Sequence, residues 1–383
     1  MEGFEERSRG SLFFAISLLL CLPTNFRFSE SVGFGELGLL LCILLFFFRY
    51  FSLKHRRRGM RAAASMPMAL LCYLIFVLLP VTFFNSLYEN GALFRDYLAF
   101  LFCGLVILSC ALYGLDVRKS MRIFCSLLLV YLVATYFFGG DAFWYSVRFT
   151  GGAKNPNQLA LYIVCAVFAA VISYDSKAAR YFFGFTLGLI GLATVSDAYY
   201  LFLGVIFSCY AAVALFPYRF FFLTFPIVLL LLMSAIFLFF PDSSEYISEV
   251  WETADEGGSR VSLYLHGLMA WLNDFYTFIL GNGAGAFSGA YMPYEGAEAH
   301  NTPIDMLSIG GCVAFVLFYS YFFYIVWSYY KLGRKMEVSI LIGIFVFSFF
   351  HFVLRHPVFW VAIYLAGLNL TVYLKRSRDL CVE

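Results

Sequence analysis

The chain alternates long apolar runs with short polar segments along nearly its whole length. Many of the runs approach the ~20 residues that a helix needs to cross a bilayer. The pattern therefore predicts about 12 transmembrane helices. They are expected at residues 12–23, 32–51, 66–84, 93–113, 123–139, 156–174, 181–195, 198–216, 220–240, 302–330, 338–354 and 357–374. The first and seventh runs are short, and the region 181–216 also allows a different division.

Composition excludes the class of soluble proteins. Hydrophobic residues make up 62% of the 383 residues and charged residues 13%, whereas a soluble domain contains roughly 45–50% apolar residues. The N-terminus mixes acidic and basic side chains, and no A-x-A-like site follows the first run, so a cleaved signal peptide is not expected. We expect an all-α integral membrane protein in which residues 1–383 form a single polytopic domain.

Basic residues concentrate in polar segments that fall on alternate sides of the predicted helices. The segments 49–61, 116–122, 175–180, 331–337 and 375–379 can all lie on the cytoplasmic side, as the positive-inside rule favours. Both termini are then cytoplasmic. The basic residues left on the outer side are Arg27, Arg95, Arg148, Lys154, Arg260 and Arg355.

Cysteine and histidine show no spacing typical of a metal site. The cysteines lie almost wholly in apolar runs without a C-x-x-C pair, so we expect them to pack as small apolar residues. The histidines lack an H-E-x-x-H or similar ligand pattern. We therefore expect neither a metal nor another cofactor.

The long polar segment 241–301 is expected outside the membrane, between the ninth and tenth apolar runs. It is strongly acidic, and its single basic residue, Arg260, is either a counter-ion for these acids or a ligand for an anion. The stretch after Arg260 is mostly apolar, so we expect an interfacial helix interrupted at Gly267 and again at Asn273–Asp274. A glycine-rich loop, 281–296, leads on to His300, and it lacks the Gly-Lys-Ser/Thr of a phosphate-binding P-loop.

Two inward-running helices share a start signal, in which a capping residue precedes a proline. The signal consists of Asn155, Pro156 and Gln158 in one helix, and of Thr302, Pro303 and Asp305 in the other. A third helix is expected to start at Pro357, after His356. Helix N-termini carry partial positive charge and unpaired N–H groups, so these outward-facing starts suit anionic ligands.

Three polar residues on the outer side combine into a candidate site, which can extend to Arg355 and His356. Arg148 lies shortly before the helix that begins at Pro156, His300 lies just before the one that begins at Pro303, and Arg260 stands alone in the acidic segment. Arginine offers a permanent charge and a bidentate fork for phosphate, and a neutral histidine can accept a proton near pH 7. The combination suits group transfer from a phosphate-linked donor. Each residue also has a purely structural interpretation, as an interfacial anchor or a counter-ion.

Four segments carry a family resemblance that covers roughly residues 140–370. They are VRFTGGAKNPNQLALY, SRVSLYLHGLMAW, GNGAGAFSG with AHNTPIDMLSIGGCVAFVLF, and HPVFWVAIYLAGL. Together they resemble the O-antigen ligase and polymerase family of bacterial membrane glycosyltransferases. The resemblance implies a GT-C-type architecture with a periplasmic loop of short helices. It also implies metal-independent, inverting transfer of a glycan from undecaprenyl pyrophosphate at the periplasmic face of the inner (cytoplasmic) membrane.

The resemblance also implies roles for individual residues. Arg148 and Arg260 would bind the donor pyrophosphate, His300 would be the general base, and Asn301 would orient His300.

The chain departs from the family at one position. Many relatives have an arginine where the segment VSDAYY places Asp197. Arg355 or Lys154 could take the place of that arginine, and His356 is a further candidate for a supporting role.

Polymerisation of lipid-linked repeat units is the favoured function, because of the Arg-Phe-x-Gly…Asn-Pro-Asn element at 148–157. The close alternative is an O-antigen ligase that passes the finished glycan to lipid A-core. A transporter or lipid flippase ranks lower, because the candidate groups share one face and no internal repeat is visible. The expected partners are the lipid-linked donor, an acceptor glycan, membrane lipids and a chain-length regulator protein, with no nucleic acid.

Overall fold

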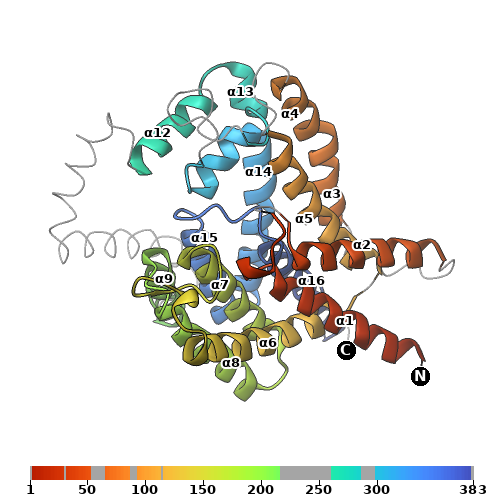
Figure 1. Cartoon of the computed structure of the whole chain (residues 1–383). Coiled ribbons are helices and arrows are strands. Elements are labelled where there is room, and N and C mark those ends of the chain that lie inside the picture. The colour runs from red at the N-terminus through yellow and green to blue at the C-terminus, as the bar shows by residue number, and fades with distance from the viewer. Residues whose placement is uncertain are drawn as a thin grey trace. The chain divides into compact units, whose positions relative to one another are not determined.

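The computed structural model describes residues 2–29, 32–52, 65–86, 93–113, 115–215, 260–285 and 298–380 (Figure 1). Four expectations fall wholly or partly outside these residues. They are the predicted helix at 220–240, most of the basic segment 49–61, the acidic residues before Arg260 in the segment 241–301, and residues 286–296 of the predicted glycine-rich loop.

Helices form almost all of the described secondary structure, so the all-α prediction is confirmed. They are α1 (Glu2–Leu20), α2 (Phe34–Ser52), α3 (Ser65–Tyr73), α4 (Leu79–Ser86), α5 (Leu93–Tyr113), α6 (Val117–Phe138), α7 (Pro156–Ser173), α8 (Lys177–Leu192), α9 (Asp197–Leu215), α12 (Arg260–Trp271), α13 (Phe275–Leu280), α14 (Thr302–Lys331), α15 (Lys335–Phe347) and α16 (Pro357–Leu380). A π-helical segment, η2 (Leu74–Leu78), joins α3 to α4, and short 3-10 turns occur at η1 (Thr24–Phe26) and η3 (Asp141–Phe143). The strands β1 (Trp144–Tyr145) and β2 (Arg148–Phe149) form a small antiparallel hairpin.

Five helical segments of the described chain are long and apolar enough to cross a membrane: 65–85, 94–112, 117–138, 156–173 and 302–331. Shorter apolar helices occupy Arg9–Leu20, Phe34–Phe48, Asp197–Val213 and Pro357–Tyr373. All nine coincide with runs that the sequence predicts as spans. These observations indicate a membrane protein, and a total of about 12 spans stays a prediction.

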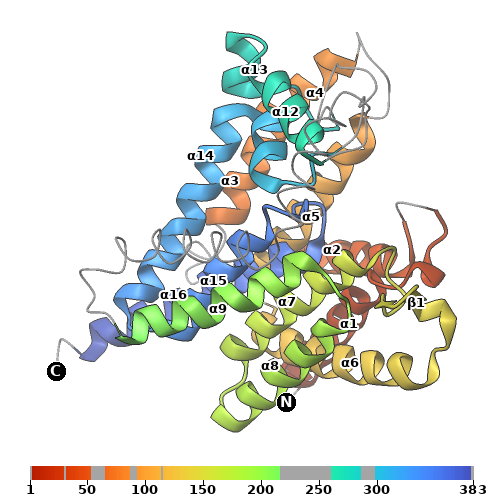
Figure 2. The ribbon, with the colours of Figure 1, turned by 90° about the vertical axis from the view of Figure 1, so that its left-hand side faces the viewer.

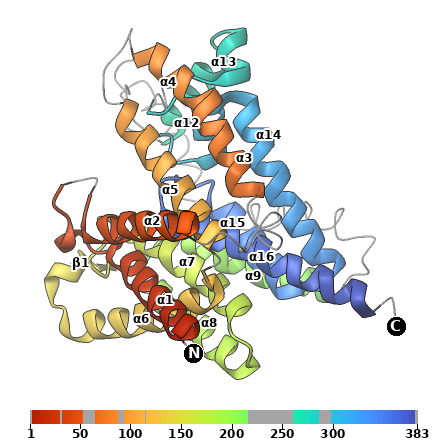
Figure 3. The same cartoon turned by 90° about the vertical axis from the view of Figure 1, so that its right-hand side faces the viewer.

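The chain divides into two compact units, which we describe separately. Unit 1 consists of residues 1–72, 99–200 and 353–383, and unit 2 of residues 73–98 and 201–352. In unit 1, α7 packs against α6, α8 and α16, and nearly all of its side chains are buried. Helix α1 packs against α2 and α6 (Figure 3).

In unit 2, α12, α13 and α15 pack against α14 (Figure 2). Helix α14 is not continuous, because Gly311 has φ 60° and ψ −163°. This break separates a short first part of α14, which begins directly after His300 and Asn301, from the long second part. The sequence pattern predicts one uninterrupted helix at 302–330, so this break is a new feature of the fold.

The glycine-rich loop explains how the break is tolerated. A regular helix would pair the carbonyls of Ser308 and Ile309 with N–H groups beyond Gly311. Here the backbone N–H groups of Asn282 and Gly283 donate to these two carbonyls instead, at 2.8 and 2.9 Å. Ser308 and Ile309 are buried, where unpaired backbone carbonyls are costly, so the inserted loop stabilises the broken helix.

Close backbone approach requires glycine on both sides of this contact. A Cβ atom at Gly281 would overlap the backbone of Ile309 and Gly310, and one at Gly311 would overlap that of Ile279 and Leu280. Gly281 also has φ 75°, which glycine adopts without a steric penalty. These glycines therefore fix the first part of α14 in place.

Candidate functional site

His300 lies in a strained turn just before α14. Its φ is 53°, in the left-handed region that non-glycine residues seldom adopt. The backbone N–H of Ala299 donates to Asp305 Oδ1 at 2.9 Å, and that of Asn301 donates to Asp305 Oδ2 at 3.2 Å. Asp305 is fully buried. One internal carboxylate therefore holds both neighbours of His300.

The His300 side chain faces outward beside a second carboxylate. It is 51% exposed, and its Nδ1 lies 3.8 Å from Oε2 of Glu298, whose side chain is 17% exposed. This separation is that of an ion pair and not of a short hydrogen bond. Sequence reasoning missed Glu298, since it counted this residue only as one acid among many. The spacing of two residues from His300 was the available signal.

Asn301 acts as the N-cap of α14. Its Oδ1 accepts the Ile304 N–H at 3.2 Å, and the residue is buried. The prediction that Thr302 is the cap was wrong by one residue, because Thr302 already belongs to the helix. Thr302 instead binds the segment after α15: its N–H donates to the Ser348 carbonyl at 2.8 Å and its hydroxyl to the His351 carbonyl at 2.6 Å.

Helix α12, which begins at Arg260, packs against this turn. A Cβ atom at Gly267 would lie 2.7 Å from Ile304 Cγ2, so glycine lets α12 approach closely. The predicted helix break at Gly267 was therefore wrong, whereas the one at Asn273–Asp274 is confirmed. Arg260 lies about 10 Å from Gly267 along the axis, given the rise of an α-helix. Arg260 and His300 thus belong to adjoining elements of unit 2.

Arg148 is anchored in unit 1. It follows the turn of the β1–β2 hairpin, and its Nε donates to the Thr194 carbonyl at 3.1 Å. Its Nη2 donates to Asn157 Oδ1, in the first turn of α7, also at 3.1 Å. The neighbouring Val195 has φ 45°, a strained value for a β-branched residue. The guanidinium is therefore fixed between the start of α7 and the loop before α9.

The supporting candidates also lie in unit 1. Asp197 is the first residue of α9 and is exposed, shortly after the loop that Arg148 contacts. Lys154 is exposed, and its backbone N–H donates to Gln158 Oε1 at 3.2 Å. Arg355 and His356 are half-buried in the turn before α16, and the His356 ring packs edge-on against Tyr162 with centroids 6.5 Å apart.

The predicted caps of α7 are confirmed. Asn155 Oδ1 accepts the Gln158 N–H at 2.8 Å, and Pro156 occupies the first turn. Helix α16 likewise begins at Pro357 as expected.

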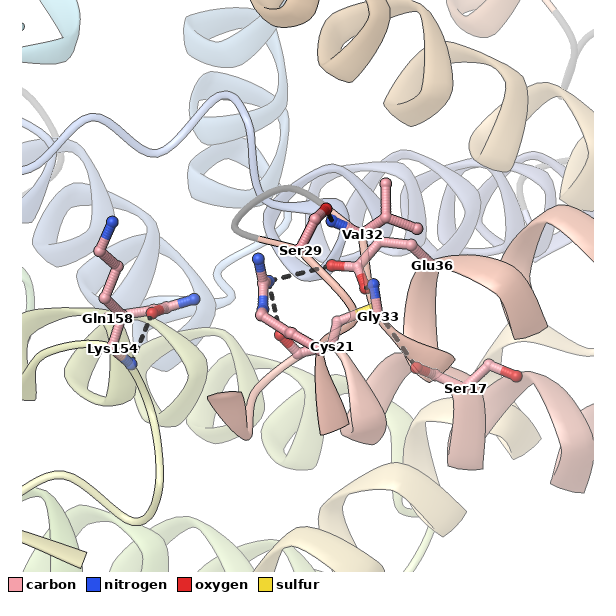
Figure 4. Close-up of polar contacts among 9 residues, drawn as sticks. Ser17, Cys21, Ser29, Val32, Gly33, Glu36, Lys154 and Gln158 are labelled. Atoms are coloured by element: carbon pink, nitrogen blue, oxygen red, sulfur yellow. Dashed lines mark hydrogen bonds and ion pairs between the residues drawn. The ribbon is translucent and has the colours of Figure 1, made fainter. Parts of the chain in front are cut away.

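An ion pair in unit 1 was not foreseen. Arg27 Nη2 donates to Glu36 Oε1 at 3.0 Å and to the Cys21 carbonyl at 3.3 Å. The second oxygen of Glu36 accepts the Gly33 N–H at 2.9 Å. Figure 4 shows Glu36, Gly33 and Cys21 together with Lys154. The pair holds the chain between α1 and α2.

The predicted site residues thus fall into two groups. Arg260, His300 and Asn301 lie in unit 2, and the others lie in unit 1. Comparison with known protein families and with curated proteins finds no match. The family resemblance therefore stays an interpretation of the motifs.

The described residues contain no group of three His, Cys, Asp or Glu side chains placed to hold a metal ion. What they do contain is a half-exposed imidazole next to a carboxylate, at the start of a membrane-length helix. A proton on Nδ1 would face the Glu298 carboxylate and would leave Nε2 as the proton acceptor. The geometry is suited to general-base chemistry on a hydroxyl group.

Proposed function

We propose that the protein is a GT-C-type membrane glycosyltransferase with about 12 spans that polymerises undecaprenyl-pyrophosphate-linked repeat units of O-antigen or a similar polysaccharide. It would act without a metal at the periplasmic face of the bacterial inner membrane, with both termini cytoplasmic. The observation that carries the proposal is the His300 turn, in which an exposed imidazole lies 3.8 Å from Glu298 at the start of α14.

The chemical step is a single displacement at the anomeric carbon. His300 takes the proton from the acceptor hydroxyl as its oxygen bonds to that carbon. The bond from the carbon to the pyrophosphate oxygen breaks at the same time, and undecaprenyl pyrophosphate leaves. Attack from the side opposite the leaving group inverts the anomeric centre.

Arg148 and Arg260 would stabilise the charge that develops on the leaving pyrophosphate. A guanidinium has five N–H donors, and the bonds to Thr194 and Asn157 use two of those of Arg148. Both bonds fix its direction before a donor arrives, so little ordering is left for the reaction itself. Arg260 begins the helix that packs on the His300 turn.

An O-antigen ligase would use the same donor chemistry with lipid A-core as acceptor. The polymerase is favoured by the Arg148-Phe149-x-Gly151 element, which forms β2 and the turn before α7.

A transporter or flippase is the third candidate, and the break at Gly311 is the observation in its favour, because transporters often contain discontinuous helices. However, Asn282 and Gly283 already satisfy the carbonyls of Ser308 and Ile309 at the break. This makes the break a poor site for a coupling ion, and so the enzyme remains the favoured function.

A reconstituted assay separates the three functions. Purified protein in liposomes receives an undecaprenyl-pyrophosphate-linked oligosaccharide with EDTA present. A ladder of longer lipid-linked products supports the polymerase, and transfer to added lipid A-core supports the ligase. Movement of the donor across the bilayer without a new glycosidic bond would contradict both.

A further inference from the structure

His300 lies between two carboxylates, Glu298 and Asp305, that have no role in the displacement described above. We infer that both are positioning residues for His300: Asp305 fixes its backbone, and Glu298 fixes its imidazole. The inference rests on the proposed function, in which His300 is the general base.

The backbone evidence is the pair of hydrogen bonds to Asp305. A left-handed backbone at a residue with a Cβ atom persists only when its surroundings enforce it. The N–H groups of Ala299 and Asn301 lie on either side of His300, and the two oxygens of Asp305 accept them separately. Asp305 is fully buried, so solvent does not compete for these oxygens. The carboxylate thereby aims the His300 side chain outward.

The imidazole evidence is the 3.8 Å separation between His300 Nδ1 and Glu298 Oε2. A negative charge there stabilises the imidazolium that forms when Nε2 takes the acceptor proton, and it favours a proton on Nδ1 in the neutral ring. Glu298 is the less exposed partner, with 17% of its side chain accessible against 51% for His300. It can therefore act as the fixed member of the pair.

Besides Glu298, four titratable or charged groups belong to α14 and to the elements packed on this turn. They are Asp305 on α14, Arg260 and His266 on α12, and His351 in the segment after α15. Glu298, by contrast, lies at an ion-pair distance from His300, with 3.8 Å between its Oε2 and the imidazole Nδ1. It is therefore the group to replace first.

The first test compares Glu298→Gln with Glu298→Asp in the reconstituted assay. We expect Gln to lower kcat roughly 10- to 100-fold with an unchanged KM for the lipid-linked donor, a loss typical of a removed orienting partner. Removal of the negative charge disfavours the imidazolium, so the acidic limb of the pH–rate profile should shift to lower pH. Aspartate keeps the charge and should restore the limb. Full kcat with an unmoved limb in Glu298→Gln would overturn the role of Glu298.

The second test is a double-mutant cycle between Asp305→Asn and His300→Ala. If Asp305 acts through His300, Asp305→Asn lowers kcat in the wild-type background and causes no further loss in His300→Ala. An equal loss in both backgrounds would show a merely structural role and overturn the inference for Asp305. Melting temperatures of each variant in detergent identify any loss through unfolding.

Single variants distinguish failure of the proposed function from failure of the positioning roles. If His300→Ala alone keeps full turnover, the proposed general base is wrong, and the inference falls with it. If His300→Ala is inactive while Glu298→Gln and Asp305→Asn turn over at the wild-type rate with the wild-type pH profile, the inference fails and the proposed function stands.

Discussion

Replacement of Gly311 by alanine probes the contact that positions the first part of α14. Gly311 has φ 60° and ψ −163°, and Gly140 provides a matched control with φ 63° and ψ −165°. A Cβ atom at Gly140 would have nothing within 4 Å, whereas one at Gly311 would overlap the backbone of Ile279 and Leu280. The two substitutions therefore share the backbone strain and differ in the collision.

The magnitude follows from this difference. The shared strain costs roughly 1–3 kcal/mol at either position. At Gly311, room for the Cβ atom can be made only by moving α14 away from the glycine-rich loop. That movement breaks the hydrogen bonds from Asn282 and Gly283 to the α14 carbonyls, which contribute about 1 kcal/mol each. We expect Gly311→Ala to be about 2 kcal/mol more destabilising than Gly140→Ala.

Two measurements check this expectation. Equilibrium unfolding in detergent micelles gives the difference in the free energy of unfolding. Hydrogen exchange gives the location, because amides of residues 281–285 should exchange faster in Gly311→Ala and at the wild-type rate in Gly140→Ala. Equal unfolding curves and equal exchange in the two variants would refute the account of the inserted loop.

Three further substitutions test local claims. Arg148→Lys keeps the positive charge but loses the planar guanidinium that contacts Thr194 and Asn157. We therefore expect kcat/KM for the lipid-linked donor to fall at least about 10-fold. An unchanged kcat/KM would argue against bidentate phosphate binding. Asn155→Ala removes the cap of α7 and should lower the free energy of unfolding by about 1 kcal/mol, and a neutral result would mean that the cap is dispensable. Glu36→Gln removes the negative charge that pairs with Arg27, whose side chain is 20% exposed against 18% for Glu36. Because solvent partly screens this ion pair, we expect the free energy of unfolding to fall by about 1–2 kcal/mol. Unchanged stability would contradict this expectation.

Helix starts could be predicted where the signal is local. Asn155 and Gln158 are three residues apart, so their capping contact is visible in the sequence, and Pro357 marks the start of α16 in the same way. The start of α14 was misplaced by one residue because the Thr302 hydroxyl binds the His351 carbonyl. That partner lies far along the chain, and no local pattern points to it.

The remaining features depend on contacts between distant segments. The break at Gly311 is stabilised by residues 281–285, which donate hydrogen bonds to the carbonyls of Ser308 and Ile309. Hydropathy does not report such contacts, so residues 302–330 appear in the sequence as one apolar run. In the sequence, Glu298 is one of many acids in the segment 241–301. Its position beside His300 depends on the turn that the Asp305 carboxylate holds in place. The sequence thus identified His300 as a candidate, but its surroundings required the fold.

The most direct test of the central claim is the turnover of His300→Ala on an undecaprenyl-pyrophosphate-linked oligosaccharide, with EDTA present. His55→Ala is the matched control, because His55 lies in the basic segment expected at the cytoplasmic face. The account predicts that His300→Ala stays folded and extends the glycan at least about 100-fold more slowly, as loss of a general base requires, while His55→Ala matches the wild type. Wild-type extension by folded His300→Ala would contradict the account.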